Sequence, residues 1–267
     1  MSPAAAETAL TRNYAECDRI ARAGDHDRWL AALFAPERLR PHLHAIAAFA
    51  CETGRIGERV REPLAGEIRL AWWREALMGL RPAEAAGNPV AAALIDTIAR
   101  FALPIADVVD LLEALTFDVN RQDMASVAEL ETYGRATAGA LIAMAARVLA
   151  EGRETNVAQA SDEAGAGLAL TRALLEFAGG GETKFLPRPV RERGRDGLVE
   201  LVDAATARFE AAEARLTSLP GEVAPAFAPL ATARLELRRW RRSGAHPFRA
   251  AASWRRQWAL WIWLRRR

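Results

Sequence analysis

The chain has 267 residues, of which 51% are hydrophobic and 26% charged, and its formal net charge is +2. This length allows one large domain or two small ones with a sizeable buried core, and the composition is that of an ordinary soluble protein. No apolar run approaches the ~20 residues that a membrane span requires, so the sequence excludes an integral helical membrane protein.

Positive charge is concentrated at the C-terminal end. Residues 234–267 contain 11 arginines and one acid, Glu236, so this tail carries +10 and positions 1–233 carry −8. Such an asymmetry says more about partners than about the fold. The N-terminus lacks the charged-then-apolar pattern of a signal peptide, so we expect a cytoplasmic protein.

Cysteine and histidine are too few and too dispersed to build a metal site. Cys17 and Cys51 each fall within a helical pattern, and we expect two buried thiols rather than a disulfide. His42 and His44 are two residues apart and diverge on a helix. With only four histidines in the chain, we expect no zinc site.

The hydrophobic pattern is helical along nearly the whole chain. Glycine and proline interrupt it near residues 87–89, 179–181 and 220–221. In chain order we expect helices over about 10–24, 26–34, 37–58, 64–75, 90–101, 105–119, 130–148, 158–177, 198–216, 223–241 and 249–266. No alternating strand pattern of useful length is present. The sequence therefore predicts an all-α, single-domain helical bundle over residues 1–241, followed by a basic helix over 242–267.

The helix over 37–58 changes character along its length. Its first half presents an apolar face that includes Leu43 and Ile46. Over the last two turns the same face becomes charged, with Glu52, Arg55 and Arg59 roughly in line and Glu58 one turn beyond Arg55. A helix whose inward face turns from apolar to charged is expected to end at a polar cavity.

Three stretches between residues 49 and 187 carry short motifs that follow one another in order along the chain. They are Phe49-Ala50-Cys51-Glu52; Phe117-Asp118 with Ser126-x-x-Glu129-Leu130-x-x-Tyr133 and Ala138-Gly139; and Gly167-x-Ala169-Leu170-Thr171 with Lys184-Phe185-Leu186-Pro187. In order and spacing they resemble the motifs of the squalene/phytoene synthase family. The resemblance covers roughly residues 10–240 and implies the isoprenoid synthase fold.

The resemblance also implies a chemistry that the residues of this chain do not suit. Enzymes of the family join two prenyl diphosphates, and magnesium held by two aspartate-rich clusters neutralises the leaving diphosphate. The matching positions here hold Gly54, Arg55, Glu58, Glu176, Gly179 and Gly180. At an effective dielectric of ~20, a cation ~4 Å away opposes Mg²⁺ by several kcal/mol. We therefore expect no metal site and no cofactor.

The polar residues near these motifs are expected to lie at the mouth of the cavity. They are Glu52, Arg55, Glu58, Asp118, Arg121, Asp123, Tyr133 and Glu176. They can form a network of charges that satisfy one another, or line a retained pocket for an anionic lipid or an isoprenoid. A third alternative is a working magnesium site, whose catalytic residues would be Glu52, Glu58, Asp118 and Glu176.

One branch of the family departs from the pattern in the same way, namely the squalene-synthase-like assembly factors of respiratory complex I. The chain resembles this branch in Phe49-x-x-Glu52 and in Phe185-Leu186-Pro187. The resemblance implies a non-catalytic helper whose partner is a protein of a membrane complex. Two alternatives remain, a divergent magnesium-dependent prenyltransferase and an isoprenoid or lipid carrier.

The last predicted helix combines tryptophan with arginine. Trp254, Trp258 and Trp261 follow an i, i+4, i+7 pattern, with Arg255 and Arg265 beside them. Large aromatic rings and arginines are typical of a helix at lipid headgroups, which predicts peripheral contact with the inner membrane. The same stripe could instead pack on the bundle as its last helix. No nucleic-acid motif accompanies it, so we expect no nucleic-acid partner.

Overall fold

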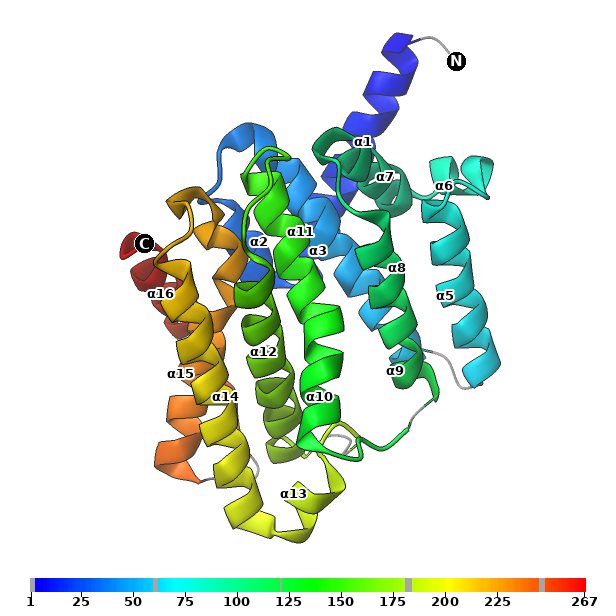
Figure 1. The fold of residues 1–267 in the computed structure, drawn as a ribbon. Helices are drawn as coiled ribbons and strands as arrows, with labels where there is room; N and C mark the ends of the chain where they lie inside the picture. The colour runs from blue at the N-terminus through cyan, green and yellow to red at the C-terminus, as the bar shows by residue number, and fades with distance from the viewer. Residues whose placement is uncertain (1–2, 60–61, 121, 181–183, 245–247) are drawn as a thin grey trace. The chain divides into compact units, whose positions relative to one another are not determined.

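The computed structural model describes residues 3–59, 62–120, 122–180, 184–244 and 248–267 (Figure 1). Over these ranges the chain forms helices and turns and no strand, which confirms the all-α prediction. The chain divides into two compact units. Unit 1 comprises Met1–Asn120 and Met144–Thr155, and unit 2 comprises Arg121–Ala143 and Asn156–Arg267.

Unit 1 is built from short and medium helices, several of which begin at a proline. Pro63, Pro82 and Pro89 each stand at the first helical position, where the missing N–H group has no helical partner to lose. The elements are α1 (Pro3–Gly24), α2 (His26–Ala32), η1 (Glu37–Leu39), α3 (Arg40–Gly54), α4 (Ile56–Arg59), α5 (Pro63–Leu77), α6 (Pro82–Gly87), α7 (Pro89–Phe101), α8 (Ile105–Ala114) and α9 (Thr116–Asn120).

Two predicted helices of unit 1 are interrupted. The helix predicted over 37–58 ends at Gly54, a residue of low helix propensity, and α4 begins two residues later. The helix predicted over 105–119 divides into α8 and α9 at Leu115. There the Thr116 hydroxyl donates to the backbone oxygen of Glu113 at 2.6 Å, which satisfies a carbonyl at the end of α8.

A buried polar network joins α1, α3 and α7 of unit 1. The Tyr14 hydroxyl donates to Asp96 Oδ2 at 2.6 Å, and the Thr97 hydroxyl donates to the Ala93 backbone oxygen at 2.8 Å. His42 Nδ1 lies 2.8 Å from the Tyr14 oxygen and 2.9 Å from the Thr97 oxygen. Because both hydroxyl protons are already engaged, the neutral imidazole donates from Nδ1, and both hydroxyl groups take part as donor and acceptor.

This network makes the stability of unit 1 depend on pH. Burial lowers the pKa of His42 from 6.5 to about 4; Asp96 opposes the shift and Arg100 adds to it. The unfolded chain takes up the proton near pH 6.5 while the folded chain does not, so stability is complete above that pH and falls as the pH drops toward 4. Between about pH 7 and about pH 5, we expect His42 to cost the protein about 2 kcal/mol of unfolding free energy.

Urea unfolding followed by circular dichroism at the two pH values measures this loss. In His42→Asn the amide can keep a hydrogen bond to the Tyr14 hydroxyl, and the pH dependence should shrink by that amount. His26→Asn, at an exposed position of α2, is the matched control and should leave the dependence as it is. Equal pH dependence in the wild type and in His42→Asn would contradict the assignment.

Unit 2 is organised around one long helix, α12, which lies between α10 and α14 (Figure 1). A π-helical segment, η2, follows α10 and leads into α11, which continues into unit 1. The elements are α10 (Val127–Gly134), η2 (Arg135–Gly139), α11 (Ala140–Leu149), α12 (Ala158–Ala178), α13 (Arg188–Glu192), α14 (Gly194–Leu216), η3 (Gly221–Phe227), α15 (Pro229–Ser243) and α16 (Ser253–Arg265).

Glycine allows α10 and η2 to contact α12 backbone to backbone. A Cβ atom on Gly165 would lie 2.5 Å from the Gly134 oxygen and 2.5 Å from the Gly139 nitrogen, closer than side chains approach. An ion-pair network then ties the same helices to α14. The buried Glu131 accepts bonds from Arg208 Nε at 2.8 Å and Nη2 at 2.9 Å, and Arg208 Nη1 lies 3.1 Å from Glu163 Oε2.

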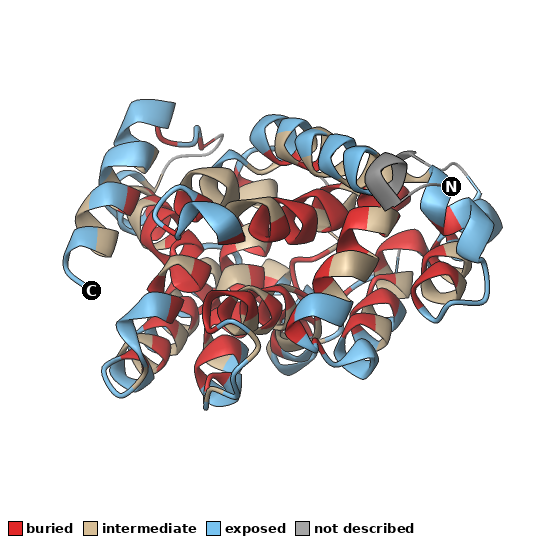
Figure 2. Cartoon of the chain, turned by 90° about the horizontal axis from the view of Figure 1, so that it is seen from above, coloured by how far each residue is buried: buried red, intermediate tan, exposed pale blue. Residues whose placement is uncertain are grey.

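Burial follows the inner faces of the helices in each unit (Figure 2). Helix α5 departs from the apolar pattern seen in the sequence. Leu70, Trp73 and Leu77 are buried, while Leu64 and Ile68, which marked the predicted helix, are exposed. Among the described helices, none is both long enough and apolar enough to cross a membrane.

Candidate functional site

In unit 1 the predicted site residues lie where α3, α4 and α9 end or begin. Glu52 belongs to the last turn of α3, Arg55 caps that helix, and Glu58 lies on α4. A Cβ atom on Gly57 would lie 2.7 Å from the backbone oxygen of Asp118. Only glycine permits this approach, so α4 is held directly against α9 and the polar end of the first motif meets the second motif.

The acids of unit 1 differ in their exposure to solvent. Asp118 is buried, Glu52 is half-buried, and Glu58 is exposed. Burial raises the pKa of the Cys17 thiol to about 12, and the charge of Glu52 contributes to that shift. The charge of Glu52 is therefore felt by the Cys17 thiol of α1, while Glu58 faces solvent one turn beyond Arg55.

The Arg55 side chain extends toward the end of α1. A Cβ atom on Gly24 would lie 3.0 Å from Arg55 Nη2 and 2.7 Å from Cys51 Sγ. Burial raises the pKa of Cys51 to about 11, although the charges of Arg55 and Arg28 oppose the rise. Both cysteines are free and buried, as predicted, and both remain protonated thiols at neutral pH.

In unit 2 the helix α12 places Glu176 beside an arginine. Arg172 Nε donates to Glu176 Oε1 at 2.6 Å, one helical turn away. The same guanidinium lies 4.4 Å from the centre of the Phe185 ring, and the Tyr133 ring is 5.5 Å from that ring. Unit 2 therefore brings the second and third sequence motifs together. Sequence reasoning missed Arg172, although its i, i+4 spacing to Glu176 was a usable signal.

Asp123 lies between the two parts of the second motif and is held by α13. Its carboxylate accepts a hydrogen bond from Arg191 Nη2 at 3.1 Å while remaining largely exposed. Next to it, the Met124 N–H donates to the Lys184 backbone oxygen at 2.9 Å, which joins the two loops. Arg121, also predicted at the cavity mouth, lies outside the described residues.

The donor groups differ in kind between the two units. Unit 1 supplies three carboxylates, on Glu52, Glu58 and Asp118, together with the cation of Arg55. Unit 2 supplies Glu176, whose charge is already balanced by Arg172. Within the described residues of either unit, no three or more His, Cys, Asp or Glu side chains gather as a metal-ligand group.

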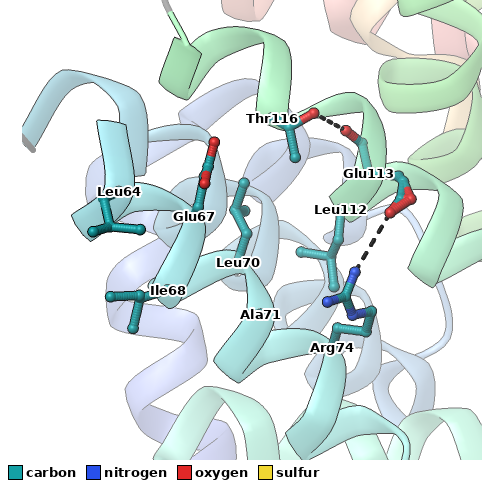
Figure 3. A pocket seen from close by; sticks show the side chains of 9 residues that line it. All are labelled: Leu64, Glu67, Ile68, Leu70, Ala71, Arg74, Leu112, Glu113 and Thr116. Carbon is teal, nitrogen blue, oxygen red and sulfur yellow. Dashed lines mark hydrogen bonds and ion pairs between the residues drawn. The ribbon is translucent and has the colours of Figure 1, made fainter. Parts of the chain in front are cut away.

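Unit 1 also contains a groove between α5, α8 and α9, apart from the predicted site residues (Figure 3). It has a volume of about 400 Å³ and an apolar lining with a charged rim, where Arg74 Nη1 lies 3.4 Å from Glu113 Oε1. The lining residues are Leu64, Glu67, Ile68, Leu70, Ala71, Arg74, Leu112, Glu113 and Thr116. None of the predicted cavity residues lines it. The sequence pattern alone does not show that Leu64 and Ile68 are exposed, because that depends on which face of α5 is buried.

The C-terminal helix α16 packs on α15 and still presents aromatic rings to solvent. Leu260 is buried against the unit, and Trp263 Nε1 donates to Glu213 Oε1 at 3.0 Å. Much of the rest of the helix is exposed (Figure 2). The exposed residues include the five predicted for membrane or partner contact, Trp254, Arg255, Trp258, Trp261 and Arg265, here called the tryptophan face.

Within the tryptophan face, rings and guanidinium groups are arranged in contact. The rings of Trp258 and Trp261 are stacked with their centres 5.0 Å apart. The Arg255 guanidinium lies 5.1 Å from the centre of Trp254, and that of Arg265 lies 4.8 Å from the centre of Trp261. The three tryptophans are 64%, 57% and 38% exposed in chain order. Such a large exposed aromatic surface is unusual and typically marks an interaction site.

Comparison with curated proteins gives distant relatives of two kinds. The chain is 34% identical over 125 residues to the "Bifunctional protein CrtB/UppS" of Streptomyces coelicolor, which covers 46% of this chain and 21% of that protein. It is 24% identical over 146 residues to "NADH dehydrogenase (ubiquinone) complex I, assembly factor 6" of Rattus norvegicus, covering 55% of this chain and 44% of the relative. The protein of that name from Mus musculus is 22% identical over 242 residues, covering 84% and 72%.

Solved structures establish the fold. A dehydrosqualene synthase in complex with ligand superposes with a TM-score of 0.79 at 16% identity, covering 95% of this chain and 96% of that one. The squalene synthase HpnC from Alicyclobacillus acidocaldarius superposes with a TM-score of 0.70 at 22% identity, covering 90% and 97%. The predicted isoprenoid synthase fold is confirmed.

The family is established by a match over most of the chain, and the individual relatives add less. The part of this chain that aligns with the Streptomyces protein covers only about a fifth of that protein, and the part that aligns with the rat protein covers less than half of it. The family described as squalene/phytoene synthase, in contrast, matches residues 21–179, which is more than half of this chain. That stretch contains α3, α4, α9 and α12, the helices that carry the residues described above. The chain belongs to the squalene/phytoene synthase family.

Proposed function

We propose that this protein is a non-catalytic member of its family that acts as an assembly or binding factor for a membrane protein complex. The observation that carries the proposal is an arginine at or beside each stretch that matches an acidic cluster of the family. Arg55 stands in the first stretch, and Arg172, one turn before the second, is bonded to Glu176. The relatives named as complex I assembly factors in rat and mouse support the choice of a membrane complex as partner.

The donor set suits magnesium poorly. Magnesium prefers near-octahedral oxygen ligands and is held mainly by carboxylates, waters and substrate phosphates. A guanidinium near the ion adds a repulsion of several kcal/mol at an effective dielectric of ~20. Glu176 would first have to leave Arg172, a charge-assisted hydrogen bond at 2.6 Å. The protein therefore needs no cofactor for its proposed role.

The first prediction of this proposal concerns diphosphate chemistry. Purified protein incubated with farnesyl or geranylgeranyl diphosphate and Mg²⁺ should release no diphosphate, even at high enzyme concentration. Adding magnesium at a fixed concentration of a non-hydrolysable diphosphate analogue should also cause no further change in the melting temperature, because the protein holds no magnesium–diphosphate complex. An active family member assayed in parallel is the positive control. Magnesium-dependent release that disappears in Glu58→Gln would overturn the proposal.

A divergent magnesium-dependent prenyltransferase is the second candidate. It is favoured by Glu52, Glu58 and Asp118, which keep carboxylates at the adjoining ends of α3, α4 and α9. The 34% identity to the Streptomyces protein, whose name denotes a bifunctional CrtB/UppS, points the same way. The diphosphate assay decides between the two candidates.

The proposed role places the protein peripherally on the inner membrane, through the tryptophan face. Burying one large aromatic side chain gains about 2 kcal/mol, and each basic residue near an anionic surface adds roughly 1 kcal/mol. Losing Trp254 and Trp258 together should therefore weaken binding to phosphatidylcholine vesicles containing phosphatidylglycerol by at least about a hundredfold. Vesicle flotation of the Trp254→Ser, Trp258→Ser double variant measures this loss.

Leu64→Ser, at an exposed apolar position on α5 of unit 1, is the matched control and should bind vesicles like the wild type. Circular dichroism verifies that the double variant keeps its helices, as expected from the outward position of both rings. If the double variant floats as well as the wild type, the tryptophan face is not the membrane contact.

The third prediction concerns the assembly role. Deleting the gene in its source organism should lower the amount of assembled respiratory complex I, measured by activity staining of native gels. A copy carrying Glu58→Gln should restore the complex, because the role requires no chemistry at that carboxylate. A copy lacking Trp254 and Trp258 should restore it poorly. Unchanged complex I in the deletion strain would contradict the assembly role.

A further inference from the structure

Helices α14 and α15 of unit 2 enclose a second groove, with a volume of about 160 Å³. This space is several times the ~30 Å³ that a water molecule occupies in the liquid. Its lining combines a short apolar floor with one face of arginines. The lining residues are Val202, Thr206, Arg234, Leu237, Arg238 and Arg241.

The arginines of the groove are not equally neutralised. Arg234 forms an ion pair with Glu213 of α14, and Arg241 Nη1 lies 2.9 Å from Asp203 Oδ1 of the same helix. Arg238 lies one turn from each along α15, and among the described residues it has no hydrogen-bond or ion-pair partner. Glu213 and Asp203 thus pair with Arg234 and Arg241, and among the described residues Arg238 pairs with no carboxylate.

The residue of α14 that lines the groove between these two carboxylates is Thr206, which carries no charge. Its hydroxyl already donates to the Val202 backbone oxygen at 2.7 Å. Glu213 cannot compensate either, because it accepts a hydrogen bond from Trp263 at 3.0 Å and lies 3.8 Å from Arg267, in addition to pairing with Arg234. The groove therefore keeps a local excess of positive charge.

The environment of Arg238 shows the same excess. Although Arg238 is exposed, the desolvation of its guanidinium lowers the pKa below the ordinary value, and the like charges of Arg234 and Arg242 lower it further. Glu213 acts in the opposite direction without reversing the shift. An anion in the groove would relieve this repulsion, whereas a neutral or cationic molecule would not.

We propose that this groove binds a phosphate group, with Arg238 as its central contact. A guanidinium donates two parallel N–H bonds to phosphate oxygens, and flanking arginines can share the remaining oxygens. The apolar floor, formed by Val202 and Leu237, would accommodate an alkyl or acyl segment attached to the phosphate. The shared chemistry fits either a free phosphate or diphosphate or the phosphate of a lipid headgroup. The inference goes beyond the proposed function and does not rest on it.

The test measures phosphate binding to the full chain. Isothermal titration with inorganic phosphate and with pyrophosphate forms one arm of the experiment. Flotation with phosphatidylcholine vesicles, with and without phosphatidic acid, forms the other. In at least one arm, Arg238→Gln should weaken binding on the order of tenfold or more, as expected for loss of a charge-assisted contact. Arg215→Gln, an exposed arginine of α14 outside the groove, removes the same charge and is the matched control.

A second variant keeps Arg238 and instead places a carboxylate on α14, across the groove from it. Thr206→Glu supplies the missing carboxylate across the groove, so it should abolish phosphate binding without loss of thermal stability. Loss in the titration arm identifies a free phosphate as ligand, and loss confined to the vesicle arm identifies a lipid phosphate. If neither arm responds to Arg238→Gln, or if Arg215→Gln weakens binding equally, diffuse charge explains the attraction and the site is refuted. Because these variants leave the tryptophan face intact, the result is separable from that of the proposed function.

Discussion

The contact between α4 and α9 at Gly57 is the constraint on which the site end of unit 1 depends. Without a Cβ atom at that position, the backbone of α4 can rest on the carbonyl of Asp118. Helix α3 ends at Gly54, Arg55 caps it, and Gly57 belongs to the separate helix α4. The same contact places Glu58 and Asp118 on neighbouring helices, while Arg55 lies at the junction between α3 and α4.

Each unit carries an arginine beside its motif residues. In unit 1 Arg55 caps α3 and extends toward the end of α1, and in unit 2 Arg172 pairs with Glu176 and lies on Phe185. An arginine that lies on an aromatic ring is held by cation–π attraction as well as by its ion pair, which makes it costly to displace. The charge of Glu176 is thereby balanced by an arginine of the same helix.

The sequence predicted the architecture well because helical periodicity is a local signal. It also identified the helices that carry Glu52, Asp118 and Glu176, since the motifs have fixed spacing. It could not predict that α4 lies directly against α9, because that approach depends on the contact between Gly57 and Asp118, which are far apart in the chain. Arg238 was equally hidden. Its lack of a partner depends on which residues of α14 face it, and no periodicity reports that.

Glu213 has a consequence for the way the end of the chain is anchored. This single carboxylate holds Arg234 of α15, the indole of Trp263 and, less closely, the terminal Arg267. Loss of this one carboxylate would therefore remove a contact of α15, a contact of α16 and a contact of the chain end at the same time.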